Sequence, residues 1–330
     1  MFDKPAVMLA PLAGYTDPPF RLLCFEFGAD LAETEMISSE GLIRGCERTA
    51  AMMDIFEGEG RVGIQLFGSR PPSMASAAEI AAKKRPAFID INFGCPVKKV
   101  VRKNGGAGLM RDLDLMGRIA RAVTSAVELP VTAKIRSGWT RESENYIEAG
   151  RILQDCGVSA VTLHPRYRSQ FFRGEANWNH ITSLNAELEI PVIANGDIAG
   201  PAELREIINK TGCLTVMVGR AAIGRPWLFN KLRREIRRIY GSIVENGDYE
   251  KEAEYPDSLS DKLKIFEKFV RMEVDYKGEQ RAILEMRKHY RWYIRGYRGM
   301  KEYRARLSRC ETLEEVLSIL SQVREEIEGN

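Results

Sequence analysis

A cysteine in a polar, glycine-rich setting is the first place in the chain where residue types and spacing could support chemistry. Cys95 follows Asn92 within DINFGCP, and the next stretch, VKKVVRKNGGAGLMRD, mixes basic residues with glycines. A loop of this composition should move and attract phosphates. A thiol with a pKa near ~8.5 stays mostly protonated at neutral pH and can donate a proton. With no histidine close by in sequence, we favour a proton donor over a thiolate nucleophile or an inert buried cysteine.

Two polar side chains on predicted strands suit a flavin. Lys134 falls on the inward, polar face of VTAKIR. An inward lysine either forms a Schiff base or holds a fixed positive charge beside an anion. Such a charge favours a reduced flavin, whose pyrimidine ring is negative, and Gln65 has the donor and the acceptor that fit the edge of that ring. The competing interpretation of Lys134 is an internal salt bridge with Asp90 or Glu35.

Glycines follow two late strands and suggest a phosphate site. One strand ends in Asn195-Gly196-Asp197 and the next in Gly219-Arg220. In an α/β barrel, the loops after the seventh and eighth strands commonly bind phosphate. Glycines let backbone N–H groups approach the anion, and an arginine adds a charge-assisted bond. The alternative is that these glycines only serve tight turns.

Eight short apolar runs recur along the first 240 residues, most of them followed by a helical pattern. The predicted strands are 7–11, 31–36, 62–68, 88–94, 131–136, 160–165, 192–197 and 215–220. The predicted helices include 72–84, 112–127, 146–156 and 201–211. Strands that alternate with helices pair in parallel, and eight such units predict an α/β fold, a (β/α)8 TIM barrel. An open doubly wound sheet is the alternative, although no GxGxxG follows the first strand.

Alternation within these strands also places polar residues inside the barrel. Asp90 and Asn92 oppose apolar neighbours on one strand, and Thr162, His164 and Arg166 do so on another. Buried polar groups without partners are costly, so these side chains are best explained as the lining of a site at the carboxyl-end mouth. The inward position makes His164 a stronger candidate than His180 or His289, which we interpret as structural.

The pattern changes after residue 240. Residues 1–240 form the predicted catalytic domain, the polar and acidic residues 241–258 a linker, and 259–330 a small helical bundle. Ser260 with Asp261, and Thr312 with Glu315, are the expected helix starts. Basic residues gather here and indicate a polyanionic partner, namely Arg281, Arg287, Lys288, Arg291, Arg295, Arg298, Lys301, Arg304, Arg306 and Arg309. The interleaved aromatics, Tyr290, Trp292, Tyr293 and Tyr297, could bind RNA or form the bundle core.

Composition argues against several classes of protein, namely disulfide-bonded, metal-binding, membrane-spanning and secreted ones. The six cysteines are scattered, and with only three histidines and no HExxH-like spacing we expect neither disulfides nor a metal site. No apolar run approaches membrane-spanning length. The amino terminus has no signal-peptide pattern, so we expect a cytoplasmic protein.

With these residues assembled, the chain resembles the tRNA-dihydrouridine synthase family, most closely its bacterial B-type branch. The matching segments occur in family order and are APLAGYTDPPFR (10–21), TEM (34–36), GIQLFG (63–68), DINFGCPVKKVVRKNGGAGLM (90–110), KIRSGW (134–139), IANGDI (193–198), GRAAIGRPWLF (219–229) and MRKHYRWY (286–293). DINFGCP followed by the glycine-rich loop is the most specific of them.

The resemblance implies bound FMN, NADPH as reductant (with NADH as the alternative) and tRNA as substrate. Cys95 falls on the family's proton donor, and Asn92 and Arg136 fall where the uracil ring is read. The implied flavin contacts are Pro11, Leu12, Ala13, Gln65, Lys134 and His164, with Asn195, Gly196, Asp197, Gly219 and Arg220 at the phosphate end.

One departure stands out, because Pro165 replaces the glycine that usually follows the histidine. Proline lacks an N–H, so a phosphate or RNA contact through that amide is in doubt. Two rivals remain at this point. A flavoenzyme acting on a free pyrimidine, such as dihydroorotate dehydrogenase, would have no need of the basic tail. A non-catalytic RNA-binding barrel would have no need of the polar set around Cys95.

Overall fold

Eight parallel strands close into a barrel in the computed structural model, which describes residues 1–241, 255–294 and 299–328. The strands are β1 (Ala6–Leu9), β2 (Leu31–Glu33), β4 (Arg61–Phe67), β5 (Phe88–Asn92), β6 (Val131–Arg136), β7 (Ala160–His164), β8 (Val192–Asn195) and β9 (Thr215–Val218). β1 pairs with both β2 and β9, and β2 pairs with β4, which closes the ring. The short β3 (Ile37–Ser38) adds to β4. The predicted (β/α)8 barrel is confirmed, and the open sheet is wrong.

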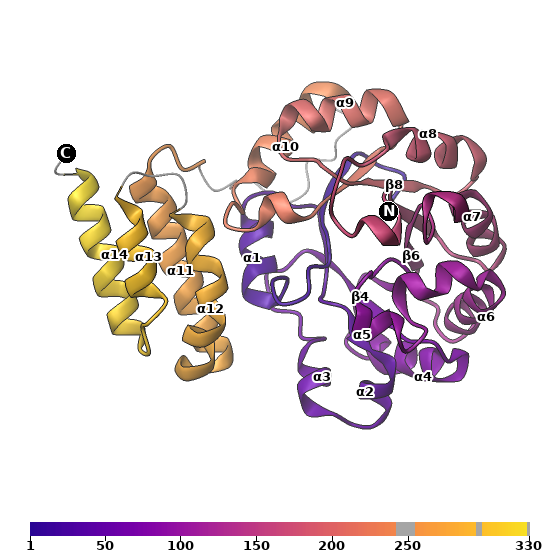
Figure 1. Cartoon of the computed structure of the whole chain (residues 1–330), viewed down its shortest axis with the longest axis horizontal. Helices are drawn as coiled ribbons and strands as arrows, with labels where there is room; N and C mark the ends of the chain where they lie inside the picture. The colour runs from indigo at the N-terminus through magenta and orange to yellow at the C-terminus, as the bar shows by residue number, and fades with distance from the viewer. Residues whose placement is uncertain (242–254, 295–298, 329–330) are drawn as a thin grey trace.

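Helices surround the barrel as the sequence predicts (Figure 1). They are α1 (Pro18–Glu26), α2 (Ser39–Ile43), α3 (Glu47–Ala51), α4 (Pro71–Ala82), α5 (Lys98–Val101), α6 (Leu113–Thr124), α7 (Tyr146–Asp155), α8 (Trp178–Glu187), α9 (Pro201–Thr211) and α10 (Leu228–Tyr240). Local signals set their ends. Asp112 caps α6 by accepting a hydrogen bond from Leu115 N, and α9 begins at Pro201 and ends at Thr211, before Gly212, which has a φ of +69°.

The inside of the barrel has an apolar floor at its amino end. Phe2, Met8, Phe88 and Met217 are buried together there, and the rings of Phe2 and Phe88 meet edge to face with centroids 5.2 Å apart. Gly63 makes room for this packing, because a Cβ at that position would lie 2.1 Å from the Phe88 ring. The floor seals one end of the barrel, so polar groups inside it are concentrated towards the carboxyl ends of the strands.

The carboxyl-terminal helices form a bundle beside α1 (Figure 1). They are α11 (Leu259–Lys277), α12 (Glu279–Tyr293), α13 (Met300–Leu307) and α14 (Leu313–Glu328). The expected start at Ser260 is wrong: Ser258 is the cap, since its Oγ accepts from Asp261 N at 3.0 Å and the S-x-x-D spacing of a capping box begins there. The second expected box is confirmed, because Glu315 N donates to Thr312 Oγ1.

The bundle packs on the barrel through aromatic side chains. Phe269 of α11 contacts Phe20 of α1 at a ring separation of 5.7 Å, and Tyr293 of α12 contacts Trp227 at 5.9 Å. One continuous apolar core includes residues of both parts. Residues 242–254 of the predicted linker lie outside the described residues. In the part of the chain that the structure describes, no helix has the length and apolarity needed to cross a membrane.

Candidate active site

Cys95 lies just beyond β5, at the mouth of the barrel, and is half-buried. Its backbone N donates to Asn92 Oδ1 at 2.9 Å, and its carbonyl accepts from Ala107 N at 3.0 Å. Gly106, with a φ of +56°, passes so close that a Cβ there would lie 2.8 Å from the Cys95 carbonyl oxygen. Burial raises the pKa of the Cys95 thiol. The thiol therefore stays protonated at neutral pH, as a proton donor requires.

A buried hydrogen-bond network connects Asn92 to the barrel interior. Asn92 Nδ2 donates to Gln65 Oε1 at 2.8 Å, while Gln65 Nε2 donates to both Asp90 Oδ2 at 2.7 Å and Glu33 Oε2 at 2.9 Å. Thr132 Oγ1 donates to the other Asp90 oxygen at 2.6 Å. Both Nε2 protons of Gln65 are used by these acids, whereas its Oε1 accepts a single bond and keeps one lone pair for a ligand donor.

Lys134 lies across from two acids but bonds to an amide. Its Nζ donates to Asn195 Oδ1 at 2.7 Å. Burial lowers the pKa of Lys134 to about 8, although the charges of Glu33 and Asp90 oppose that shift. Burial also raises the pKa of Asp90 to about 6 and that of Glu33 well above its usual range. The site thus holds one lysine over two acids whose ionisation is disfavoured.

The alternative partners predicted for Lys134 are only partly right. Asp90 acts on Lys134 through its charge, without an ion pair among the described contacts of either residue. Glu35 is elsewhere, where its carboxylate accepts a hydrogen bond from Gly14 N. The second nearby acid is Glu33, two residues earlier and therefore on the same side of the extended chain as Glu35.

Four cations converge on His164. Burial, and then the charges of Arg136, Lys134, Arg166 and Arg220, hold the pKa of His164 well below its usual range, so the ring is neutral at pH 7. Arg166 Nη1 lies 3.2 Å from His164 Nε2. Because a guanidinium only donates, Nε2 accepts and the ring proton is on Nδ1. This concentration of positive charge suits an anionic ligand.

Asp197 ties two of these arginines to the loop after β8. Its Oδ2 lies 2.5 Å from Arg166 Nη2, and its Oδ1 lies 3.2 Å from Arg220 Nη2. Arg166 is buried, whereas the Arg220 side chain is 49% exposed and has donors to spare for a ligand. The predicted phosphate residue Arg220 is therefore available at the mouth, and Asp197 orients it.

The glycines of this region allow close backbone approach. Gly196 has a φ of +122°, and a Cβ there would lie 2.9 Å from Ala176 Cβ. Gly219 faces the loop after β1, since a Cβ on it would be 3.6 Å from Ala10 and 3.7 Å from Leu12. The first and last loops of the barrel, which carry the predicted contacts Pro11, Leu12 and Ala13 and the phosphate residues, are thus neighbours.

A buried arginine, Arg136, lies beside an exposed aromatic ring, Phe172. Arg136 Nε donates to Gly94 O at 2.8 Å, and its Nη1 donates to Phe171 O at 2.8 Å. Phe172 is 50% exposed, with the guanidinium carbons of Arg136 and Arg220 at 5.5 and 5.2 Å from its ring centroid. An exposed aromatic beside two arginines can stack on a planar ligand. Sequence reasoning missed Phe172, because it lies in a loop without periodicity.

Comparison with known proteins fixes the family of this site. The family model described as dihydrouridine synthase matches residues 8–328. The chain belongs to the dihydrouridine synthase family. Similar curated proteins are tRNA-dihydrouridine synthase B of Proteus vulgaris (36% identity, 96% of this chain and 94% of that protein), of Xanthomonas campestris (38%, 96% and 91%) and of Escherichia coli K12 (36%, 95% and 94%).

The contacts described above bring the predicted site residues together at the carboxyl ends of the barrel strands. His180 and His289 are buried in packing, as expected, since His180 Nδ1 lies 2.8 Å from Ser137 Oγ and His289 packs against Tyr15 and Phe269. Within the described ranges, no group of acidic, histidine or cysteine side chains could hold a metal ion. The sequence reasoning missed Glu33 as a member of the site. It did place Arg166 on the inward face with His164, by the same alternation.

Proposed function

We propose that this protein reduces specific uridines of transfer RNA to dihydrouridine, with Cys95 as the proton donor. The single observation that carries the proposal is the placement of Cys95 at the barrel mouth, with its backbone N–H bonded to Asn92, its thiol protonated and Arg136 close by. The relatives named above act on tRNA by their names, and they match almost the whole chain.

The residues at the mouth fit FMN as the bound cofactor. Lys134 and the neutral His164 would lie beside the ring system, and Arg220 with the backbone at Gly196 and Gly219 would hold the phosphate. When bound, FMN supplies the hydride that is added to C6 of the uracil, and NADPH is the proposed reductant.

The chain's own residues then complete the reduction. Arg136 and Asn92 would orient the uracil ring, while Phe172 covers its outer side. The Cys95 thiol gives its proton to C5, which leaves a thiolate that takes a proton back from water. The raised pKa of the thiol favours this return. A target base can reach the site only if it leaves the RNA stack, and the exposed ring of Phe172 lies beside Arg136 and Arg220 where such a base would enter.

The helical bundle provides the surface that a polyanion needs. Lys288 lies beside the loop after β1, with its Nζ 5.4 Å from the Tyr15 ring centroid, and Arg291 is exposed next to it on α12. Tyr290 and Tyr293 are bundle core, which bears out the structural interpretation of those two aromatics. Arg295, Tyr297 and Arg298 lie outside the described residues. A basic surface next to the mouth favours tRNA over a free pyrimidine as substrate. Such a substrate and reductant imply action in the cytoplasm.

The deciding experiment replaces the thiol. Cys95→Ala should lower dihydrouridine formation in tRNA transcripts by at least about a hundredfold, since general acids contribute roughly 10²–10⁴ in rate. NADPH oxidation by the flavin should stay within about twofold of wild type, because it needs no proton from Cys95. Cys46→Ala is the matched control, because it changes an exposed cysteine that is far from Cys95 in the sequence. Equal loss of both activities in Cys95→Ala would remove the acid assignment.

A further inference from the structure

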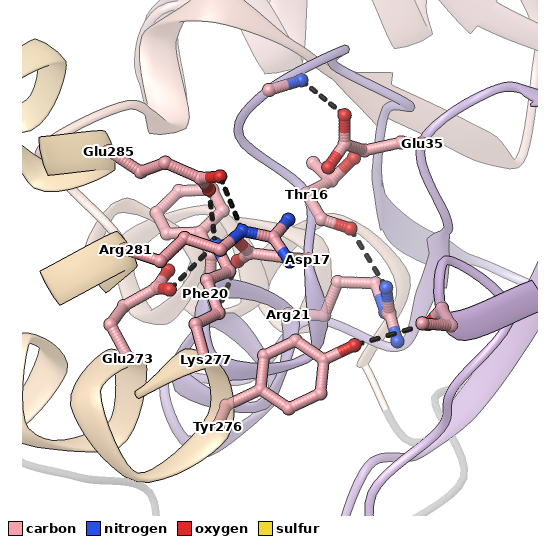
Figure 2. Close-up of polar contacts among 12 residues, drawn as sticks. Thr16, Asp17, Phe20, Arg21, Glu35, Glu273, Tyr276, Lys277, Arg281 and Glu285 are labelled. Carbon is pink, nitrogen blue, oxygen red and sulfur yellow. Dashed lines mark hydrogen bonds and ion pairs between the residues drawn. The ribbon is translucent and has the colours of Figure 1, made fainter. Parts of the chain in front are cut away.

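A buried cluster of charges joins the helical bundle to the barrel (Figure 2). Lys277, the last residue of α11, places its Nζ 2.5 Å from Asp17 Oδ2, 2.7 Å from Glu273 Oε2 and 2.9 Å from Glu285 Oε2. Arg281 adds a bond to the second Glu285 oxygen at 2.9 Å. The exposed fractions of the Lys277, Asp17 and Glu273 side chains are 6%, 7% and 1%. Asp17 is the one member of this cluster that belongs to the barrel. Within the cluster, the Lys277–Asp17 ion pair is therefore the contact that crosses the interface.

The cluster is costly to bury, although two of the three contacts of Lys277 lie within the bundle. Three carboxyl groups meet two cations there, and burial raises the pKa of Glu273 to about 8, so its ionisation is disfavoured at neutral pH. The neighbouring aromatic contacts already hold the two parts together, but apolar contact is non-directional. A buried ion pair often adds little net stability, because desolvation offsets the attraction, and in some proteins it specifies geometry instead. The cluster therefore sets the relative position of the bundle and the barrel, while the apolar contacts supply most of the stability of their interface.

Asp17 connects the cluster to the loop that carries the predicted flavin contacts. It caps α1, with Phe20 N donating to its Oδ1, and its neighbour Thr16 holds the preceding turn. Leu12 N donates to Thr16 Oγ1 at 3.0 Å, and Thr16 N donates to Leu12 O at 3.1 Å. Arg21 Nη1 donates to Thr16 O at 2.8 Å and anchors the same turn from below. A rigid path thus leads from Lys277 to residues 11–13.

A second contact between α11 and the barrel, made by Tyr276, also fixes the position of this helix. Tyr276, next to Lys277, donates its hydroxyl to Ala51 O at 3.1 Å, and its ring meets Phe56 edge to face at 5.1 Å. The basic side of α12 lies close to the loop after β1. Lys288 Nζ is 3.7 Å from the position that a Cβ on Gly14 would take. The orientation of α11 at the cluster decides where the cations of α12 lie relative to the mouth.

We propose that Lys277 is a positioning residue for the reaction: through Asp17 it fixes the bundle against the loop after β1 and so sets the angle at which tRNA meets the active site. This inference rests on the proposed function. Lys277 touches neither the substrate nor the cofactor in this role. Its loss should weaken the productive binding of tRNA and leave flavin chemistry intact.

Asp17→Asn tests this most directly. Asparagine keeps the volume and the helix cap, and Lys277 keeps Glu273 and Glu285, so the bundle retains its own bonds while the crossing ion pair is lost. We expect the KM for a tRNA transcript to rise about tenfold, as for the loss of a coupling of about 1.4 kcal/mol. We expect kcat, flavin content and tRNA-free NADPH oxidation to stay within about twofold of wild type. Lys277→Met, which leaves the carboxylates without their central cation, should show the same split with a larger rise in KM.

The matched control lies on the same pair of helices. Lys268 of α11 pairs with Glu26 of α1 at 2.6 Å, but the two side chains are 52% and 32% exposed. Such a surface pair contributes little, so Lys268→Met should keep the wild-type KM. An unchanged KM in Asp17→Asn, or a parallel loss of flavin and NADPH oxidation, would overturn the inference. If the wild-type protein forms no dihydrouridine in tRNA, the proposed function itself fails and the inference falls with it.

Discussion

At the scale of single residues, alternation along the strands was enough to select the inward side chains. Lys134, Gln65 and His164 all point into the barrel, because a strand leaves only two choices of face. Their partners could not be predicted in the same way. Which acid faces Lys134 depends on the stagger between β2, β5 and β6, so Glu33 was missed and Glu35 was named instead.

Lys134 gives a prediction at this scale. Replacing Lys134 with Met removes a charged donor next to the proposed cofactor, and hydrogen bonds to charged groups contribute about 1.5–3 kcal/mol. The Kd of the apoprotein for FMN should therefore rise between about tenfold and about a hundredfold. Titration with quenching of flavin fluorescence measures it. Lys84→Met, at an exposed ion pair with Asp54, should behave as wild type. Equal affinities in all three proteins would rule out a flavin contact at Lys134.

At the scale of elements, the strands and helices followed their local signals closely. The helix at 201–211 was predicted to the residue, because proline starts it and a left-handed glycine ends it. The start of α11 was misplaced by two residues, because the S-x-x-D spacing of the capping box selects Ser258, whereas the prediction paired Asp261 with the adjacent Ser260. Loops were the least predictable. Nothing in the sequence around Phe172 indicates that the loop bends to place it between two arginines.

The loop that carries Cys95 gives a prediction at this scale. Gly106→Ala puts a Cβ within 2.8 Å of the Cys95 carbonyl oxygen at a φ of +56°, so the loop has to shift and the thiol moves with it. Misplacement of a reacting group by about 1 Å can cost roughly a hundredfold. Dihydrouridine formation should fall by about tenfold or more while NADPH oxidation persists. Gly105→Ala is the matched neighbour, since its φ is −103° and its nearest contact would be 3.4 Å. Similar activities of the two variants would show that the loop tolerates the shift.

At the scale of the whole molecule, the sequence predicted a barrel followed by carboxyl-terminal helices, but not the way these helices meet the barrel. The change of pattern after residue 240 predicted a bundle, which the structure shows. The pairing of Asp17 with Lys277 spans 260 positions, and no local pattern couples residues so far apart. The shared apolar core was likewise invisible, because each half has a regular pattern of its own.

The interface makes stability depend on pH. Burial, and then the charge of Asp17, raise the pKa of Glu273 from 4.5 to about 8. The unfolded chain ionises this group near pH 4.5 while the folded chain keeps its proton up to about 8, so the free energy of unfolding should decrease as pH rises through that window. Glu273→Gln removes the titration. Its Tm relative to wild type should increase steadily from pH 5 to pH 8. A difference that stays constant would mean that Glu273 is ionised throughout.

The order in which the chain is made has a bearing on the pairing of β1 with β9. β1 leaves the ribosome long before β9, so its neighbour on one side is made only when synthesis reaches Thr215–Val218. Until then β1 has one open edge, and the outer side of Phe20 stays bare even longer, because Phe269 emerges later still. A newly made chain of this protein therefore exposes an unpaired strand edge and apolar surface for most of its translation. That makes the early segment, more than the finished enzyme, the part that a ribosome-associated chaperone would have reason to shield.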